Sequence, residues 1–107
     1  MAKDATIVVT GLRIGTTANV SIYGQSADVH LVRIDSVLKG KATVGKTLTV
    51  VSLPVTCSTA PYPNGDQLNV AGEAEFFVRV TGKQVTTLTA DAGVLKIPAD
   101  GTLPWSP

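Results

Sequence analysis

The sequence predicts an all-β fold with little or no helix, and three observations support this. The chain contains 15 Val and 14 Thr, and β-branched residues fit a pleated strand better than a helix. Ten Gly and six Pro divide the apolar segments into short pieces, as turns between strands require. No segment keeps the apolar period of about 3.6 residues that marks an amphipathic helix.

The length sets the number of domains. The 107 residues are enough for a single domain with a core of its own. We assign residues 1–98 to this domain. Residues 99–107 form a Pro-rich C-terminal tail that contains Trp105, the only tryptophan.

The first half of the chain contains four expected strand segments. They cover residues 5–14, with a glycine break at Gly11, and residues 18–24, 28–40 and 46–55. In the last two, the apolar residues change from one parity to the other, which indicates either burial on both faces or a β-bulge. Long strands that bend at bulges are typical of small barrels and orthogonal sandwiches.

A long loop is expected over residues 56–72, because Pro61, Pro63 and Gly65 exclude a continuous helix or central strand. Three strand segments follow the loop, namely residues 73–82, 85–90 and 93–99. The first two are close enough in sequence to form a hairpin.

The segment GKATVGKT, residues 40–47, matches the pattern of the phosphate-binding loop of nucleotide hydrolases. That loop must open a helix, whose first N–H groups bind the phosphates. Here the next residues are LTVVSLPV, which are rich in β-branched residues and interrupted by Pro54, so they are poor helix formers. We therefore interpret Gly40 and Gly45 as the ends of a loop between two strands.

Charge and composition exclude two classes of partner. Nine basic and eight acidic residues give a net charge of +1, which is too little for the neutralisation of several phosphates. Aromatic residues make up 5% of the chain, too few for a base-stacking platform. No apolar run approaches the roughly 20 residues that cross a bilayer. We expect no nucleic-acid partner and no membrane insertion.

The location of the protein is inferred from composition alone. Only 16% of the residues are charged, and a Thr-rich surface with few charges is commoner on secreted or envelope proteins. The N-terminal MAKDATIVV lacks the apolar segment and cleavage site of a signal peptide. Two explanations stay open: an intracellular protein, or a mature chain whose leader was replaced by Met. The composition favours the second, an extracytoplasmic protein.

Single cysteine and histidine residues limit the chemistry. Cys57 excludes an internal disulfide; it is either an ordinary loop thiol or one whose partner lies on another chain or a removed segment. His30 has no nearby Cys and no second His, so it builds no zinc site alone. We interpret His30 as a strand histidine satisfied by a neighbour. The sequence therefore predicts no catalytic residue, no metal and no cofactor.

Two further features have more than one interpretation. Glu73 and Glu75 share a strand face and are interpreted as solvated edge charges that oppose aggregation. The alternatives are half of an acid pair or a Ca²⁺ contact. Asn19 begins a glycosylation sequon, which has meaning only in a eukaryotic source.

Two segments, DSVLKGKATVGKTLTVVS and LNVAGEAEFFVRVTGKQVTTL, carry a resemblance. The pieces at residues 37–40, 45–51 and 72–80 resemble a pattern of bacterial secreted domains. Such domains are similar to the oligonucleotide/oligosaccharide-binding (OB) barrel of netrin modules and tissue inhibitors of metalloproteinases. The resemblance covers residues 5–97. It implies a small, partly open, five-stranded Greek-key barrel, usually outside the cytoplasm and without a known catalytic site.

The chain departs from that pattern in two ways. The metalloproteinase inhibitors depend on an amino-terminal cysteine and several disulfides, whereas this chain has only Cys57. Inhibition is therefore not carried over. Barrels of this kind also have a helix between the third and fourth strands, and here the Pro-rich loop takes its place.

Loops on a rigid β scaffold often carry binding residues. Tyr62 is the first candidate for contact with a partner, and the others are Pro61, Pro63, Asn64, Tyr23 and Trp105. The alternative for Tyr62 and Trp105 is that they fold back and cap the barrel.

Three classes of function follow. We expect a non-catalytic extracytoplasmic module that binds a protein or glycan, above all through residues 54–71. The alternative is a structural subunit of a homo-oligomer or envelope complex, which pairs through strand edges or the tail. An enzyme would need a pocket at His30 or at Glu73 and Glu75.

Overall fold

The computed structural model describes residues 2–22, 24–55, 62, 65–70, 72–82, 84–89 and 92–105. A 3₁₀ helix, Ala2–Asp4, precedes the strands. The strands are β1 (Ile7–Ile22), β2 (Gln25–Lys39), β3 (Thr47–Val51), β4 (Glu73–Thr81), β5 (Gln84–Thr87) and β6 (Val94–Lys96). No helix in this part of the chain is long and apolar enough to cross a membrane.

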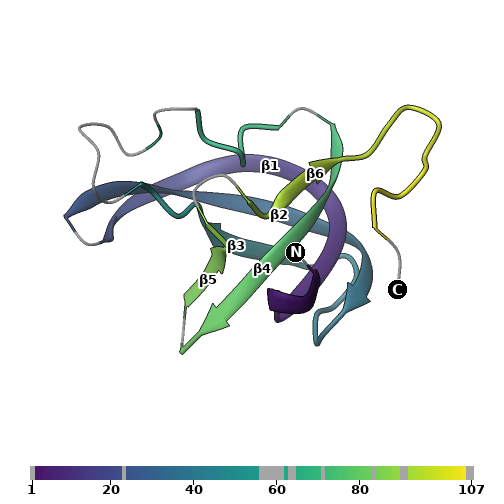
Figure 1. Cartoon of the computed structure of the whole chain (residues 1–107), viewed down its shortest axis with the longest axis horizontal. Coiled ribbons are helices and arrows are strands. Elements are labelled where there is room, and N and C mark those ends of the chain that lie inside the picture. Colours follow the sequence, from purple (N-terminus) through teal and green to yellow (C-terminus); the bar gives the residue numbers. More distant parts are fainter. Residues whose placement is uncertain are drawn as a thin grey trace.

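Five of the strands close into a barrel (Figure 1). Their order is β1-β2-β3-β5-β4, and β4 pairs again with β1. The seam between β3 and β5 is parallel and consists of one pairing, Val51 with Thr86, so the barrel is least closed there. β6 is an extra strand on β4. The predicted five-stranded, partly open Greek-key barrel is therefore confirmed, and its strand arrangement is compatible with an OB-like fold.

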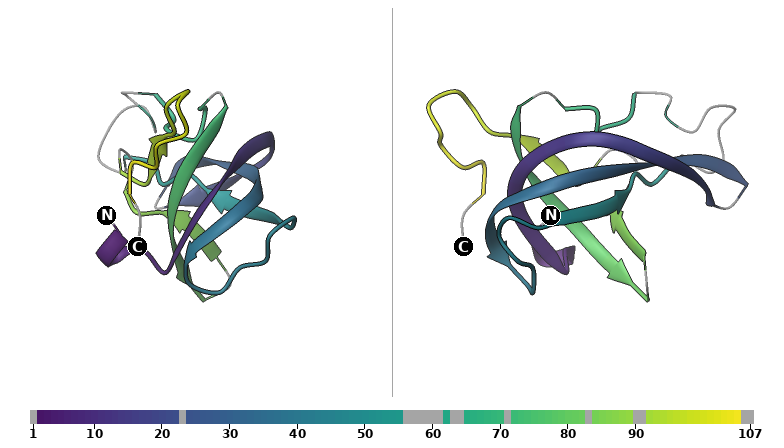
Figure 2. Two further views of the ribbon diagram at one scale, coloured as in Figure 1. Left: turned by 90° about the vertical axis from the view of Figure 1, so that its right-hand side faces the viewer. Right: turned by 180° about the vertical axis from the view of Figure 1, so that it is seen from behind.

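β1 and β2 form a long curved hairpin that extends beyond the rest of the barrel (Figures 1 and 2). Separate strands over residues 5–14 and 18–24 were predicted, and this was wrong: β1 is continuous through Gly11. The strand continues through Gly11, whose backbone lies close to β2. An added Cβ at this position would stand 2.0 Å from the carbonyl oxygen of Arg33. Four register shifts interrupt the β1–β2 pairing, which agrees with a β-bulge, one of the two explanations for the parity change in residues 28–40, whereas the β2–β3 pairing has no shift. Such shifts bend and twist strands around a barrel.

The main core lies inside the barrel. The sequence predicts that Ala74, Phe76, Val78 and Val80 alternate along one face of β4 with Phe77 opposite, and the structure agrees except at Val80, which is 38% exposed. Ala74, Phe76 and Val78 face this core, whereas Phe77 faces a second, outer cluster. Leu68, between β3 and β4, is fully buried in the main core. A residue of the β3–β4 connection thus contributes to the barrel core.

The segment with the phosphate-loop pattern joins β2 to β3, as predicted. A strand follows it instead of a helix. Gly40 has a φ of 84°, and an added Cβ would lie 2.3 Å from the carbonyl oxygen of Thr6. The turn and the close approach of the backbone explain this glycine without any phosphate.

The tail after β6 leaves the barrel and then returns to its outer surface (Figure 2). There the ring of Trp105 packs edge-on against Phe77, with the ring centroids 6.0 Å apart and an interplanar angle of 68°. Such a contact adds about 0.5–1.5 kcal/mol to the stabilisation from apolar burial.

Candidate functional site

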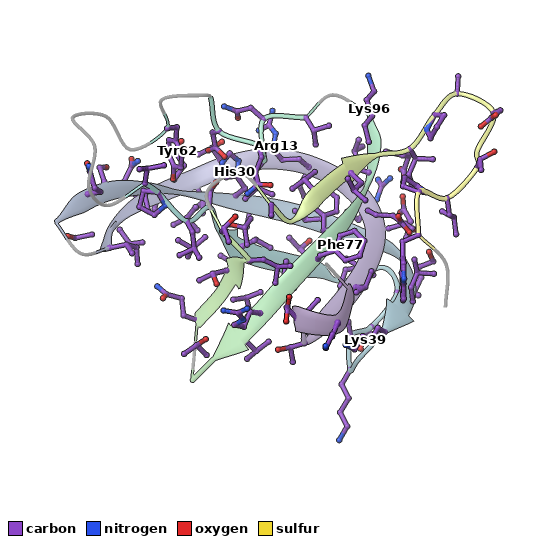
Figure 3. The ribbon with its side chains drawn as sticks, viewed as in Figure 1. Arg13, His30, Lys39, Tyr62, Phe77 and Lys96 are labelled. Carbon is purple, nitrogen blue, oxygen red and sulfur yellow. The ribbon has the colours of Figure 1, made fainter. Side chains whose placement is uncertain are left out.

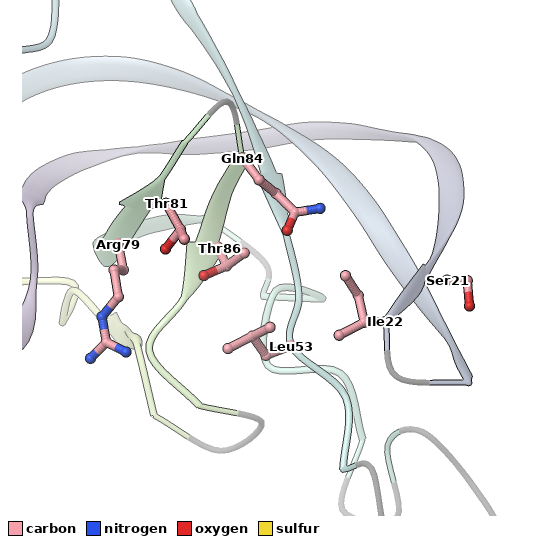
Figure 4. A pocket seen from close by; sticks show the side chains of 7 residues that line it. All are labelled: Ser21, Ile22, Leu53, Arg79, Thr81, Gln84 and Thr86. Atoms are coloured by element: carbon pink, nitrogen blue, oxygen red, sulfur yellow. The ribbon is translucent and has the colours of Figure 1, made fainter.

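A groove of about 350 Å³ lies between the end of the β1–β2 hairpin and the β4–β5 hairpin (Figure 4). Its lining residues are Ser21, Ile22, Leu53, Arg79, Thr81, Gln84 and Thr86. They come from three separate stretches of the chain, so the groove exists only when the barrel has closed.

Strand pairing explains why four polar side chains line one wall. Arg79 pairs with Thr86, and Thr81 pairs with Gln84. Directly paired residues share a face, and so do residues two apart in a strand. All four side chains therefore lie on one face of the β4–β5 ribbon.

The chemistry of the groove is mixed. Ile22 and Leu53 supply apolar surface, while three hydroxyls and the amide of Gln84 supply hydrogen-bond donors and acceptors. Arg79 is exposed and is the only charged residue of the described lining. It forms no ion pair with another described residue, so its guanidinium is available for an anionic group.

A second polar feature surrounds His30, a fully buried residue of β2. Its Nε2 lies 2.8 Å from Oδ2 of Asp66, and its Nδ1 lies 3.2 Å from the hydroxyl of Thr16. The His30 and Asp66 side chains are 1% and 3% exposed. The predicted interpretation of His30 as a strand histidine satisfied by a neighbour is confirmed by this geometry.

Asp66 is held as an anion. Burial raises its pKa, but hydrogen bonds with the side chains of His30, Ser52 and Asp28 and with the N–H of Leu68 outweigh that effect and lower the pKa to about 2. Ser52 donates from its hydroxyl to Oδ1 over 2.5 Å. An ionised Asp66 accepts a hydrogen bond from Nε2–H of His30, and the other ring nitrogen, Nδ1, lies against the hydroxyl of Thr16.

Asp28 completes this cluster. One donor atom each from Asp28, His30 and Asp66 lie within 4.8 Å of one another. Burial and the neighbouring Asp66 carboxylate raise the pKa of Asp28. Its Oδ1 accepts a hydrogen bond from the side-chain amide of Asn19 over 2.8 Å.

Tyr62 joins the cluster to the end of the β2–β3 pairing. Its hydroxyl donates to the carbonyl of Ser52 over 2.6 Å and accepts from the N–H of Asp28 over 2.8 Å. The hydroxyl thus bridges a backbone group of β2 and one of the residue that follows β3. Figure 3 shows Tyr62 and His30 on the same side of the barrel.

The other predicted contact residues are placed as follows. Trp105 is partly buried, and its backbone N–H donates to Oε1 of Glu75 over 2.8 Å. Binding of a partner by Tyr62 or Trp105 stays a prediction, although both side chains pack against the protein. Tyr23, Pro61, Pro63, Asn64 and also Cys57 lie outside the described residues.

Glu75 was predicted to be solvated, and this was wrong. It is completely buried on the outer face of β4, because the returning tail covers it. Its Oε2 has no hydrogen-bond partner among the described residues. Burial raises the pKa of Glu75, while the bond from Trp105 opposes that rise.

The variant Glu75→Gln is expected to remove a pH-dependent loss of stability. Because folding raises the pKa of Glu75, the folded state keeps a proton that the unfolded chain releases. The wild type therefore loses stability as pH rises from the ordinary value of 4.5 through the folded pKa. Glutamine stays neutral, so the variant should gain stability relative to wild type over that interval. Urea unfolding between about pH 4 and pH 8 measures the difference.

Repeating the series at high salt is the control. Salt screens exposed carboxylates but has little effect on a buried one, so the difference should persist. Parallel profiles for wild type and variant would contradict the assignment.

Sequence reasoning missed both the groove and the partners of His30. The β4–β5 hairpin was predicted, and its pairing could have placed Arg79, Thr81, Gln84 and Thr86 on one face. Nothing local in the sequence joins His30 to Asp66, which is 36 residues away.

No family model, no curated protein and no solved structure matches the chain. The geometry and chemistry of these sites are therefore the basis for assigning a function.

Proposed function

We propose that this protein is a non-catalytic binding module whose groove takes a glycan with an acidic group. The observation that carries the proposal is the wall of Arg79, Thr81, Gln84 and Thr86 beside apolar Ile22 and Leu53. Hydroxyl and amide groups pair with sugar hydroxyls, and the apolar residues pack against the C–H face of a sugar ring. A guanidinium binds a carboxylate or sulfate through paired hydrogen bonds.

The position of the groove supports this class of ligand. OB-like barrels bind oligosaccharides and oligonucleotides between the loops that join strands 1–2 and 4–5. The groove lies between the corresponding hairpins. A nucleic acid is disfavoured, because the described lining has one cation and no aromatic side chain.

An extracytoplasmic, netrin-like module is part of the same proposal. The charge-poor, Thr-rich composition supports that location, and the quoted glycine and apolar motifs support that family. A barrel fold alone does not determine a function. The proposal is therefore based on the groove residues and not on the family resemblance.

One observation favours a second candidate function, that of a structural subunit that assembles with copies of itself. β1 pairs with β4 only over residues 7–12, so beyond Leu12 one edge of β1 has no strand partner among the described residues. Ile14, next to that edge, is 51% exposed. Unpaired edges are templates for pairing with another chain. A mass in solution that rises with concentration would favour this function, and a monomer would favour the binding module.

The test of the glycan proposal is a screen of acidic and neutral oligosaccharides, followed by titration calorimetry with Arg79→Gln. Loss of a charge-assisted hydrogen bond should weaken binding of an acidic glycan by about tenfold or more. Lys96→Gln is the matched control, because Lys96 is an exposed cation of β6 that points away from the barrel (Figure 3). Equal binding by wild type and Arg79→Gln, or no glycan binding at all, would contradict the proposal.

A further inference from the structure

We propose that Asp28, His30 and Asp66 form a binding site for a divalent transition-metal ion, with Zn²⁺ as the reference ion. One nitrogen and two carboxylate oxygens lie within 4.8 Å of one another. Zinc takes such donors at about 2.0–2.2 Å, which places tetrahedral donors about 3.3–3.6 Å apart. Nε2 of His30 and Oδ2 of Asp66, now 2.8 Å apart, would need to separate by less than about 1 Å.

The atoms that face away from this point are each held by a residue outside the cluster. The three contacts are Thr16 with Nδ1 of His30 (3.2 Å), Asn19 with Oδ1 of Asp28 (2.8 Å) and Ser52 with Oδ1 of Asp66 (2.5 Å). In metal sites, such outer partners fix the tautomer of the histidine and the orientation of each carboxylate. To bind the ion, Nε2 of His30 would lose the proton that it shares with Oδ2 of Asp66, and Nδ1–H would then donate to the hydroxyl of Thr16.

Burial gives a second reason. The cluster contains two carboxyl groups, and the side chains of His30 and Asp66 are only 1% and 3% exposed. Buried charges in proteins are paired or bound to metals. Arg33, which is bound to Asp35, supplies the cluster with no contact, and a divalent cation would balance both carboxylates.

The donor set limits the choice of ion. Imidazole nitrogen suits zinc, iron and nickel, while carboxylate oxygen also suits manganese. The histidine disfavours Mg²⁺ and Ca²⁺, which take oxygen ligands. Three protein donors leave a position for water or another group. The site does not depend on the glycan proposal, since none of its three donor residues lines the groove.

The test begins with protein freed of metal by a chelator and titrated with Zn²⁺ by calorimetry. One ion per chain is expected, together with a rise in Tm that depends on Zn²⁺ concentration. The same titration with Co²⁺ should give the visible absorption of a nitrogen- and oxygen-ligated ion. Mg²⁺ should give neither effect.

Two variants locate the site. Asp28→Asn removes a partly exposed ligand of the ion. It should lower the Zn²⁺ affinity by about 100-fold or more, because loss of a direct ligand weakens binding more than loss of an outer partner does. Asp35→Asn is the matched control, because Asp35 is an exposed residue of the same strand and lies beside Glu73. It should leave the affinity unchanged.

Folding of both variants is checked by circular dichroism. His30→Gln, if it folds, should also lose the Co²⁺ absorption. The proposal is overturned if the wild type binds no Zn²⁺, or if Asp28→Asn binds it as tightly as the wild type. Loss of Zn²⁺ binding only in Asp35→Asn would place the ion at Asp35 and Glu73, and this result would also overturn the proposal.

Discussion

Replacing Gly11 with alanine is expected to lower the free energy of unfolding by about 3 kcal/mol or more, at the upper end of overpacking costs. An added Cβ would stand 2.0 Å from the carbonyl oxygen of Arg33 and 3.1 Å from its carbon. Both are backbone atoms, so the clash is relieved only when β1 and β2 move apart. These strands share the longest pairing in the barrel, and their separation would also disturb β1 against β4. Urea unfolding with linear extrapolation measures the change.

Gly15→Ala is the matched control in the same strand. A Cβ at Gly15 meets nothing within 4 Å, so the change should stay within about 0.5 kcal/mol, as for ordinary surface substitutions. Equal losses at the two positions would mean that β-propensity or chain entropy, and not the close approach to Arg33, determines the effect. A stable Gly11→Ala variant would contradict the described β1–β2 packing.

Asp66→Ala is expected to lower the free energy of unfolding by about 3–5 kcal/mol. The carboxylate accepts from Nε2 of His30, from the hydroxyl of Ser52 and from the N–H of Leu68. Alanine leaves all three buried or half-buried donors without this acceptor, and each unpaired buried donor costs about 1–3 kcal/mol. Unfolding is measured with a chelator present, so that metal binding does not contribute.

Asp35→Ala is the comparison for this variant. Its carboxylate lies 3.3 Å from Nε of Arg33, and both side chains are well exposed, so the loss should be below about 1 kcal/mol. Ser52→Ala should lie between the two, because it removes one of the three donors. If Asp66→Ala were as stable as Asp35→Ala, the buried cluster would not stabilise the link between the barrel and the β3–β4 connection.

Much of the fold could be predicted because its signals are local. The alternation of Ala74, Phe76 and Val78 against Phe77 depends on neighbouring residues alone, and the structure agrees with it. The strand after GKATVGKT was also predictable, because β-branched residues exclude the helix that a phosphate loop needs.

Errors arose where distant parts of the chain meet. Gly11 was interpreted as a break, although its role is a close approach to Arg33. Glu75 was interpreted as solvated, because no local pattern reveals that the tail returns to cover it. Asp66 and His30 come together for the same kind of reason: the connection between β3 and β4 folds back onto β2.

The groove could be predicted from the sequence only in part. The face shared by Arg79 and Thr86 follows from a hairpin that the sequence predicts. The approach of Ile22 and Leu53 to that face follows only from closure of the barrel. The sequence could therefore supply one wall of the groove but not the groove itself.

The most direct test of the binding-module proposal is an NMR titration of the labelled protein with the acidic oligosaccharides of the screen. We expect saturable shifts of backbone amides at residues 21–22, at Leu53 and at residues 79–86, and we expect them to be much weaker in Arg79→Gln. Shifts confined to the tail or to the free edge of β1, or no shifts with any of these glycans, would contradict the proposal.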